Sequence, residues 1–113
     1  MGWFNRKKQD AAEQAVIVHY NLSDDEYGLT DEREAVFRLE DRLESLIERN
    51  KVGEFDGNEF GGGEAVLYCY GPNADRLFEV IEHELRSFSA RPAYAILRYG
   101  DADRSTTERR VNL

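Results

Sequence analysis

Three carboxylates and two tyrosines in the stretch 54–81 are the side chains whose types and spacing most suggest chemistry. They are Asp56, Glu59, Glu64, Tyr68 and Tyr70. Carboxylates bind hard cations or the lysines and arginines of a basic protein, and tyrosines provide large, rigid contacts at protein interfaces. The sequence therefore predicts that these five residues contact a partner.

The same stretch begins like a calcium-binding loop, because Asp56, Asn58 and Gly61 occupy the first, third and sixth positions of that motif. The twelfth position of such a loop must supply a bidentate glutamate. Here that position is Leu67. The pattern therefore excludes an EF-hand and leaves a weak cation site on the hairpin carboxylates as an alternative.

The glycine triplet 61–63 also needs an interpretation. A phosphate-binding glycine loop opens directly into the N-terminus of a helix. The residues that follow this triplet, EAVLYCY, have the composition of a strand, and no Gly-Lys-Ser or Gly-Lys-Thr follows. The triplet therefore predicts the turn of a β-hairpin.

The remaining reactive side chains are too scattered for a catalytic or zinc site. His19, His83 and the single cysteine Cys69 are far apart in the sequence, and no serine stands in a GxSxG motif. We expect Cys69 to be buried and His83 to lie on a solvated helical face. For His19, a place on an uncovered sheet face competes with a packing role. We therefore predict no catalytic residues, no cofactor and no metal.

Composition and charge restrict the class of partner. The chain has 113 residues, which suits one domain, and a formal net charge of -8 with a pI of about 4.8. This charge disfavours DNA and RNA, whose binding depends on lysine and arginine contacts to phosphates. It favours a basic protein. Without an apolar run of membrane-spanning length or a signal-peptide pattern, we expect a cytoplasmic protein without a membrane span.

The hydrophobic pattern predicts the element order β-α-β-β-α-β. Strands are expected over 15–22, 54–60, 64–70 and 93–99, and residues 106–113 are compatible with a further strand. Apolar residues at three- and four-residue steps predict one helix from Thr30, its N-cap, to about residue 50. A second helix follows Asn73, which is a favourable N-cap.

This order is that of a ferredoxin-like α+β sandwich, with both helices on one face of a four-stranded antiparallel sheet. We expect one such domain over residues 14–113, preceded by a flexible N-terminal arm over residues 1–13. In the strand 64–70, the set Ala65, Leu67 and Cys69 suits the helix-covered core. Val66, Tyr68 and Tyr70, together with Tyr94, would then lie on the face that has no helix.

The stretch 54–81, with Arg98-Tyr99-Gly100, resembles a group of small bacterial proteins of unknown function. In that group a DG…GGGE hairpin precedes a helix that begins with YGP, an Asp and Leu-Phe. More distantly, the FDG element, the acidity and the element order are similar to the ribonuclease E regulator B family, which binds and inhibits a ribonuclease. The resemblance covers about a quarter of the chain and identifies no site residue. The long acidic N-terminal extension of that family has no equivalent in this sequence.

Together these observations predict a non-enzymatic, acidic protein-binding domain. It would mask a basic partner such as a nuclease, as a regulator or an immunity protein does. The alternatives are a ferredoxin-like domain that binds a small ligand or catalyses a reaction as a sheet-face dimer, and a homodimer-forming module without a separate ligand.

Overall fold

The computed structural model describes residues 13–100 and 107–113 of the chain. Nearly all of the expected flexible arm, residues 1–12, therefore lies outside the described residues. The described part forms an α+β arrangement of one antiparallel sheet and two helices. None of its helices is long and apolar enough to cross a membrane.

The sheet has five strands in the order β2-β3-β1-β4-β5, and every neighbouring pair is antiparallel. The strands are β1 (Gln14–Asn21), β2 (Glu54–Gly61), β3 (Glu64–Gly71), β4 (Ala93–Arg98) and β5 (Glu108–Asn112). The prediction of four strands is therefore corrected to five, because the expected additional segment pairs with β4. The predicted positions of the other four strands are confirmed to within one or two residues.

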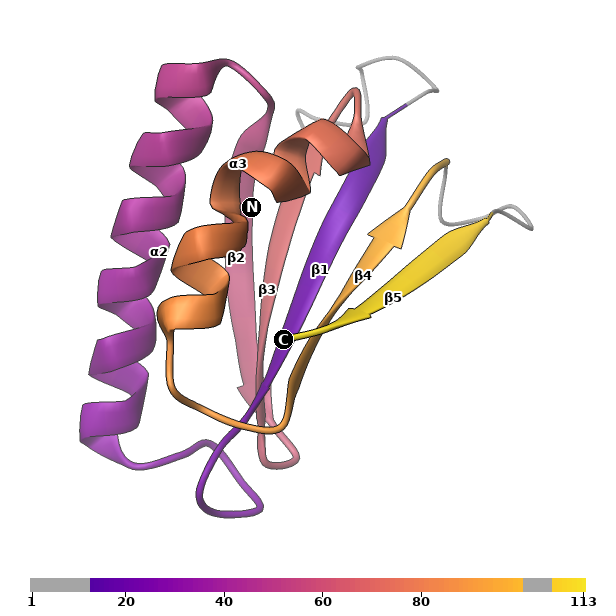
Figure 1. Cartoon of the computed structure of the whole chain (residues 1–113). Helices are drawn as coiled ribbons and strands as arrows, with labels where there is room; N and C mark the ends of the chain where they lie inside the picture. The colour runs from indigo at the N-terminus through magenta and orange to yellow at the C-terminus, as the bar shows by residue number, and fades with distance from the viewer. Residues whose placement is uncertain (1–12, 101–106) are drawn as a thin grey trace.

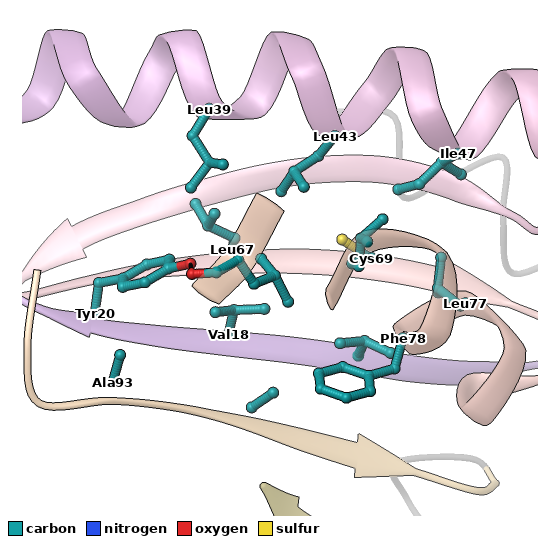
Figure 2. Packing of buried hydrophobic residues seen from close by; sticks show 14 of the residues in the cluster. Val18, Tyr20, Leu39, Leu43, Ile47, Leu67, Cys69, Leu77, Phe78 and Ala93 are labelled. Atoms are coloured by element: carbon teal, nitrogen blue, oxygen red, sulfur yellow. Dashed lines mark hydrogen bonds between the residues drawn. The ribbon is translucent and has the colours of Figure 1, made fainter. Parts of the chain in front are cut away.

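The two helices, α2 (Thr30–Asn50) and α3 (Ala74–Ser87), lie side by side on one face of the sheet (Figure 1). Their apolar stripes meet the inward side chains of β1, β3 and β4. Figure 2 shows Leu39, Leu43 and Ile47 of α2 directed toward Leu67 and Cys69 of β3. All five of these side chains are fully buried, which confirms that Ala65, Leu67 and Cys69 form the inner face of β3.

The helix starts depend on side-chain oxygens. At α3 the prediction is confirmed, since the Asn73 side chain accepts a hydrogen bond of 3.0 Å from the Arg76 N–H. At α2 the prediction is wrong, because the N-cap is Leu29 and not Thr30. The Glu32 carboxylate accepts from the backbone N–H groups of Leu29 (2.8 Å) and Ser23 (3.0 Å) instead. These bonds lower the pKa of Glu32, the one from Leu29 contributing most.

The turn between β2 and β3 has φ values of +58° at Gly62 and +80° at Gly63. Side chains rarely adopt such angles, so the glycines allow a two-residue turn. The turn is also held to the β1–α2 loop: the Leu22 N–H donates to the Gly63 carbonyl (2.8 Å) and the Gly63 N–H donates to the Glu26 carbonyl (2.9 Å). Asp24, Asp25 and Glu26 therefore lie beside the tip of the hairpin.

Tyr20 connects the sheet to the end of α3. Its ring is fully buried, and its hydroxyl donates a hydrogen bond of 2.7 Å to the Leu85 carbonyl, in the last turn of the helix. Carbonyls in the last turn of a helix have no partner within the helix. Tyr20 therefore satisfies a buried acceptor, and burial raises its own pKa well above the usual value for tyrosine.

We predict that Tyr20→Phe lowers the free energy of unfolding at pH 7 by about 1–3 kcal/mol, because it leaves the Leu85 carbonyl without its donor. The deficit should shrink above pH 10. A raised pKa stabilises the fold below the pKa of the unfolded tyrosine, and this stabilisation is lost as the pH rises toward the folded value. Urea unfolding from pH 7 to pH 11 measures both effects.

The matched control is Tyr27→Phe, which removes the same hydroxyl from a side chain that is 60% exposed. Its free energy of unfolding should equal that of the wild type across this pH range. An equal effect of the two substitutions would contradict the role given to Tyr20.

Candidate functional site

The second face of the sheet carries no helix, and we call it the open face. The strand register places a central apolar and aromatic group there, formed by Ile17, His19, Val66, Tyr68, Tyr70, Tyr94 and Ile96. Each of these side chains is only partly buried. The prediction that Val66, Tyr68 and Tyr70 point away from the helices is confirmed by the alternating burial of β3. Tyr94 joins them, since it pairs with His19.

Charged residues border this central group on both sides. On the β2 and β3 side, Glu54 pairs with Tyr70, Glu59 pairs with Val66, and Glu64 begins β3. We call these three glutamates the acidic rim. On the β4 and β5 side the charges are mixed: Arg98 lies opposite Ala15, Arg110 lies opposite Ile96, and Glu108 lies opposite Arg98. We call these two arginines the basic rim.

Tyr68 is tied to the acidic rim. Its hydroxyl donates a hydrogen bond of 2.7 Å to the Glu59 carboxylate. Partial burial, and then this bond and the charge of Glu59, raise the pKa of Tyr68 to about 12. Tyr68 thus remains a neutral donor at physiological pH, and it orients an exposed carboxylate at the edge of an aromatic surface.

A row of four side chains crosses the open face from β3 to β5. The Nδ1 atom of His19 lies 3.3 Å from the Glu64 carboxylate. The His19 ring stacks on Tyr94 with centroids 4.5 Å apart and planes 8° from parallel. The Arg110 guanidinium lies 3.7 Å from the centroid of the same tyrosine ring. This row connects the acidic rim to the basic rim and orders the ring faces between them.

Asp56 lies outside the regular alternation of side chains in β2. The pairing of β2 with β3 shifts between Phe55 and Gly57, so Asp56 occupies a β-bulge. Its charge acts on the Cys69 thiol, which is buried on the helix-covered side. Desolvation, and then the charges of Asp56 and Glu40, raise the pKa of Cys69 to about 12. The structure therefore brings together Glu59, Glu64, Tyr68 and Tyr70, with Asp56 displaced from them by the bulge.

The described surface has shallow hollows. A hollow of about 400 Å³ at the hairpin tip is shallow and is lined by Glu59, Phe60, Gly61, Glu64 and Val66. A second hollow, between the start of α2 and the α3–β4 loop, measures about 230 Å³. Ligand pockets usually enclose about 300–1,000 Å³ and bury most of the ligand. Among the described residues, no group of three or more His, Cys, Asp or Glu side chains could hold a metal ion.

No protein-family model, curated protein or solved structure matches this chain. The resemblances noted from the sequence therefore remain predictions. The assignment of the candidate site depends only on the geometry of this structure.

Sequence reasoning missed two features of the open face. The basic rim was missed, although the alternation of Tyr94, Ile96 and Arg98 with buried Ala95 and Leu97 could have placed Arg98 there. The pairing of His19 with Glu64 joins residues 45 positions apart, and only the strand order brings them together. His83 is exposed on α3, as expected.

We predict that Glu59→Gln lowers the pKa of Tyr68, because the substitution removes a charged acceptor that favours the protonated hydroxyl. The pKa should stay above the usual tyrosine value, since partial burial is the larger cause of the shift. Titration of ring-labelled tyrosines by NMR measures it. The control Glu48→Gln removes an exposed carboxylate from α2 and should leave this pKa unchanged. An unaltered Tyr68 pKa in Glu59→Gln would contradict the assigned coupling.

Proposed function

We propose that this protein is a non-enzymatic binding domain that uses the acidic half of its open face to bind a basic surface of another protein. The observation that carries this proposal is the juxtaposition, on a helix-free sheet face, of Tyr68 and Tyr70 with Glu54, Glu59 and Glu64. Tyrosines in partly buried positions are frequent anchors of protein interfaces, and a charged border selects partners of opposite sign.

The charge distribution supports a basic partner. Residues 54–71, which include β2 and β3, contain four carboxylates and no lysine or arginine. The β1–α2 loop adds Asp24, Asp25 and Glu26 beside the tip of this hairpin, where the backbone bonds to Gly63 hold it. Glu59 and Glu64 near the hairpin tip thus join the three acidic residues of this loop in one region of negative charge, which accelerates encounters with a cationic protein and makes them sensitive to salt.

The proposal also includes the fold family and the kind of partner. We interpret the arrangement as a ferredoxin-like sandwich with one additional edge strand, which the order β2-β3-β1-β4 and the two helices on one face support. By the resemblance to ribonuclease E regulator B, we propose a regulator or immunity-type inhibitor that acts in the cytoplasm on a basic protein such as a nuclease. The shape of the open face favours this reading over an enzyme that acts as a sheet-face dimer, because a flat, exposed surface does not enclose a substrate.

The test is an affinity capture with charge-matched variants. The immobilised chain is incubated with host lysate at low salt and washed at rising salt, and bound proteins are identified by mass spectrometry. We expect basic proteins on the wild type and their loss on Glu59→Gln/Glu64→Gln, because these carboxylates are the proposed contacts. The control, Glu44→Gln/Glu48→Gln, makes the same change in net charge on the exposed side of α2 and should retain them.

Two results would contradict the proposal. One is the absence of any protein that the wild type retains and the Glu59/Glu64 variant loses. The other is equal loss on both variants, which would show a response to net charge alone and not to the open face.

A further inference from the structure

Residues 1–8, which lie outside the described part of the chain, have the composition of a partner for the open face. Their sequence is MGWFNRKK, with three cations (Arg6, Lys7 and Lys8), no carboxylate and two large aromatic residues (Trp3 and Phe4). Aromatic residues and cations together complement a surface that combines tyrosines with carboxylates. We call residues 1–8 the N-terminal segment.

The start of β1 determines where this segment joins the sheet. On the helix-covered side, the Gln14 side chain accepts a hydrogen bond of 2.7 Å from the Ala74 N–H at the start of α3. That side is therefore occupied at this end of the strand. On the open face the same end carries Tyr70 and Glu54, since Ala15 pairs with Tyr70 and Tyr70 pairs with Glu54. A chain that turns back here meets the open face and not the core.

The length of the segment matches the length of the face. An extended chain rises about 3.3 Å per residue, so the eight residues of β1 and an extended N-terminal segment each span roughly 26 Å. Residues 9–13 are enough for the reversal, because connections of two to about six residues commonly join neighbouring elements. Residues 6–8 would then lie at the Gln14 end of the face, and residues 3 and 4 would lie toward the hairpin tip.

The charges along the face favour its β3 side as the course of the segment. Glu54 lies at the Gln14 end, and Glu59 lies about 13 Å further along, since their partners on β3 are four residues apart. Residues 54–71 contain no lysine or arginine, whereas the charges of the β4 and β5 side are mixed. A cationic segment therefore meets unopposed negative charge only over β2 and β3.

We propose that the N-terminal segment folds back over the β3 side of the open face, with its cations near Glu54 and its two aromatic rings against Val66 and Tyr68. The inference rests on the proposed function and deepens it, because the segment becomes an internal competitor of the basic partner. The partner then binds only those molecules in which the segment has left the face.

An internal competitor needs little intrinsic affinity. A short linker gives an effective concentration on the order of 1 mM, so a contact with a Kd of about 0.1 mM between separate molecules is about nine-tenths formed within one chain. Coverage of the face in about nine of ten molecules lowers the apparent affinity for a partner about tenfold.

Trp3 is the only tryptophan, so its fluorescence reports the place of the segment in the full chain. We expect a blue-shifted emission and weaker acrylamide quenching than in the chain unfolded in urea. Lys7→Glu/Lys8→Glu should shift the emission to the red and raise quenching to the unfolded level, because the acidic rim repels the reversed charges. The control Arg38→Glu/Arg49→Glu makes the same change in net charge on the exposed side of α2 and should behave like the wild type.

A nitroxide label on Asn5→Cys tests which face is covered. Cys69 is buried and the pKa of its thiol is raised to about 12, so a thiol-directed label reacts with the introduced cysteine. The label should broaden the amide NMR signals of β3 more than those of α2, which lies on the other side of the sheet (Figure 1). Broadening in a mixture of spin-labelled chain and isotope-labelled chain without nitroxide would show that the segment covers a second copy, which contradicts the inference.

A synthetic peptide with the sequence of residues 1–10 is the probe for competition. It should shift the amide signals of Val66 and Tyr68 in the Lys7→Glu/Lys8→Glu variant, whose face is open. We expect about tenfold weaker binding of the same peptide to the wild type, because the internal segment occupies the site.

Four results would overturn the inference: wild-type quenching of Trp3 that equals quenching in urea, equal red shifts in the two charge-reversal variants, equal broadening of β3 and α2, or equal affinity of the peptide for wild type and variant. An exposed Trp3 in a chain that still captures basic proteins through Glu59 and Glu64 would refute the inference and leave the proposed function intact. A covered face on a chain that captures nothing through these glutamates would support the place of the segment and refute the proposed function.

Discussion

The in-phase pairing of β1 with both β3 and β4 is the constraint on which the rest of the structure depends. Because side chains alternate along a strand, this register puts Val16, Val18 and Tyr20 on the helix side together with Leu67 and Ala95. A shift of one residue would exchange the two faces of the central strand. The same register that builds the core therefore assembles the open face, and neither surface can change alone.

Much of the fold could be predicted from local pattern, since the strands and helices follow from hydrophobic period and from glycine and proline positions. The errors have physical causes. Thr30 has the chemistry of an N-cap, but Glu32 reaches back to the Leu29 and Ser23 N–H groups and performs that role. The sequence shows Gly57 as an interruption, but whether Asp56 bulges depends on the partner strand.

The candidate site could be predicted on one side only. Glu59, Glu64, Tyr68 and Tyr70 lie on consecutive strands of a hairpin, so local alternation is enough to group them. The row from Glu64 through His19 and Tyr94 to Arg110 joins four strands that are remote in sequence. Its existence depends on the order of strands in the sheet, which no local pattern contains. The two arginines on the β4 and β5 side of the face were not predicted for the same reason.

The edges of the sheet support the choice of the open face, and not of an edge strand, in the proposed binding. An exposed edge strand is a template for pairing with another chain unless it is bent, short or charged. At one edge, β2 is interrupted by the bulge at Asp56 and carries glycines at 57 and 61. At the other, β5 has only five residues, and three of them are Glu108, Arg109 and Arg110. With both edges poorly suited to pairing, the partly buried tyrosines and isoleucines of the open face are the better candidates for contact with a partner. Contacts there bury side chains while the backbone hydrogen bonds of the sheet stay as they are.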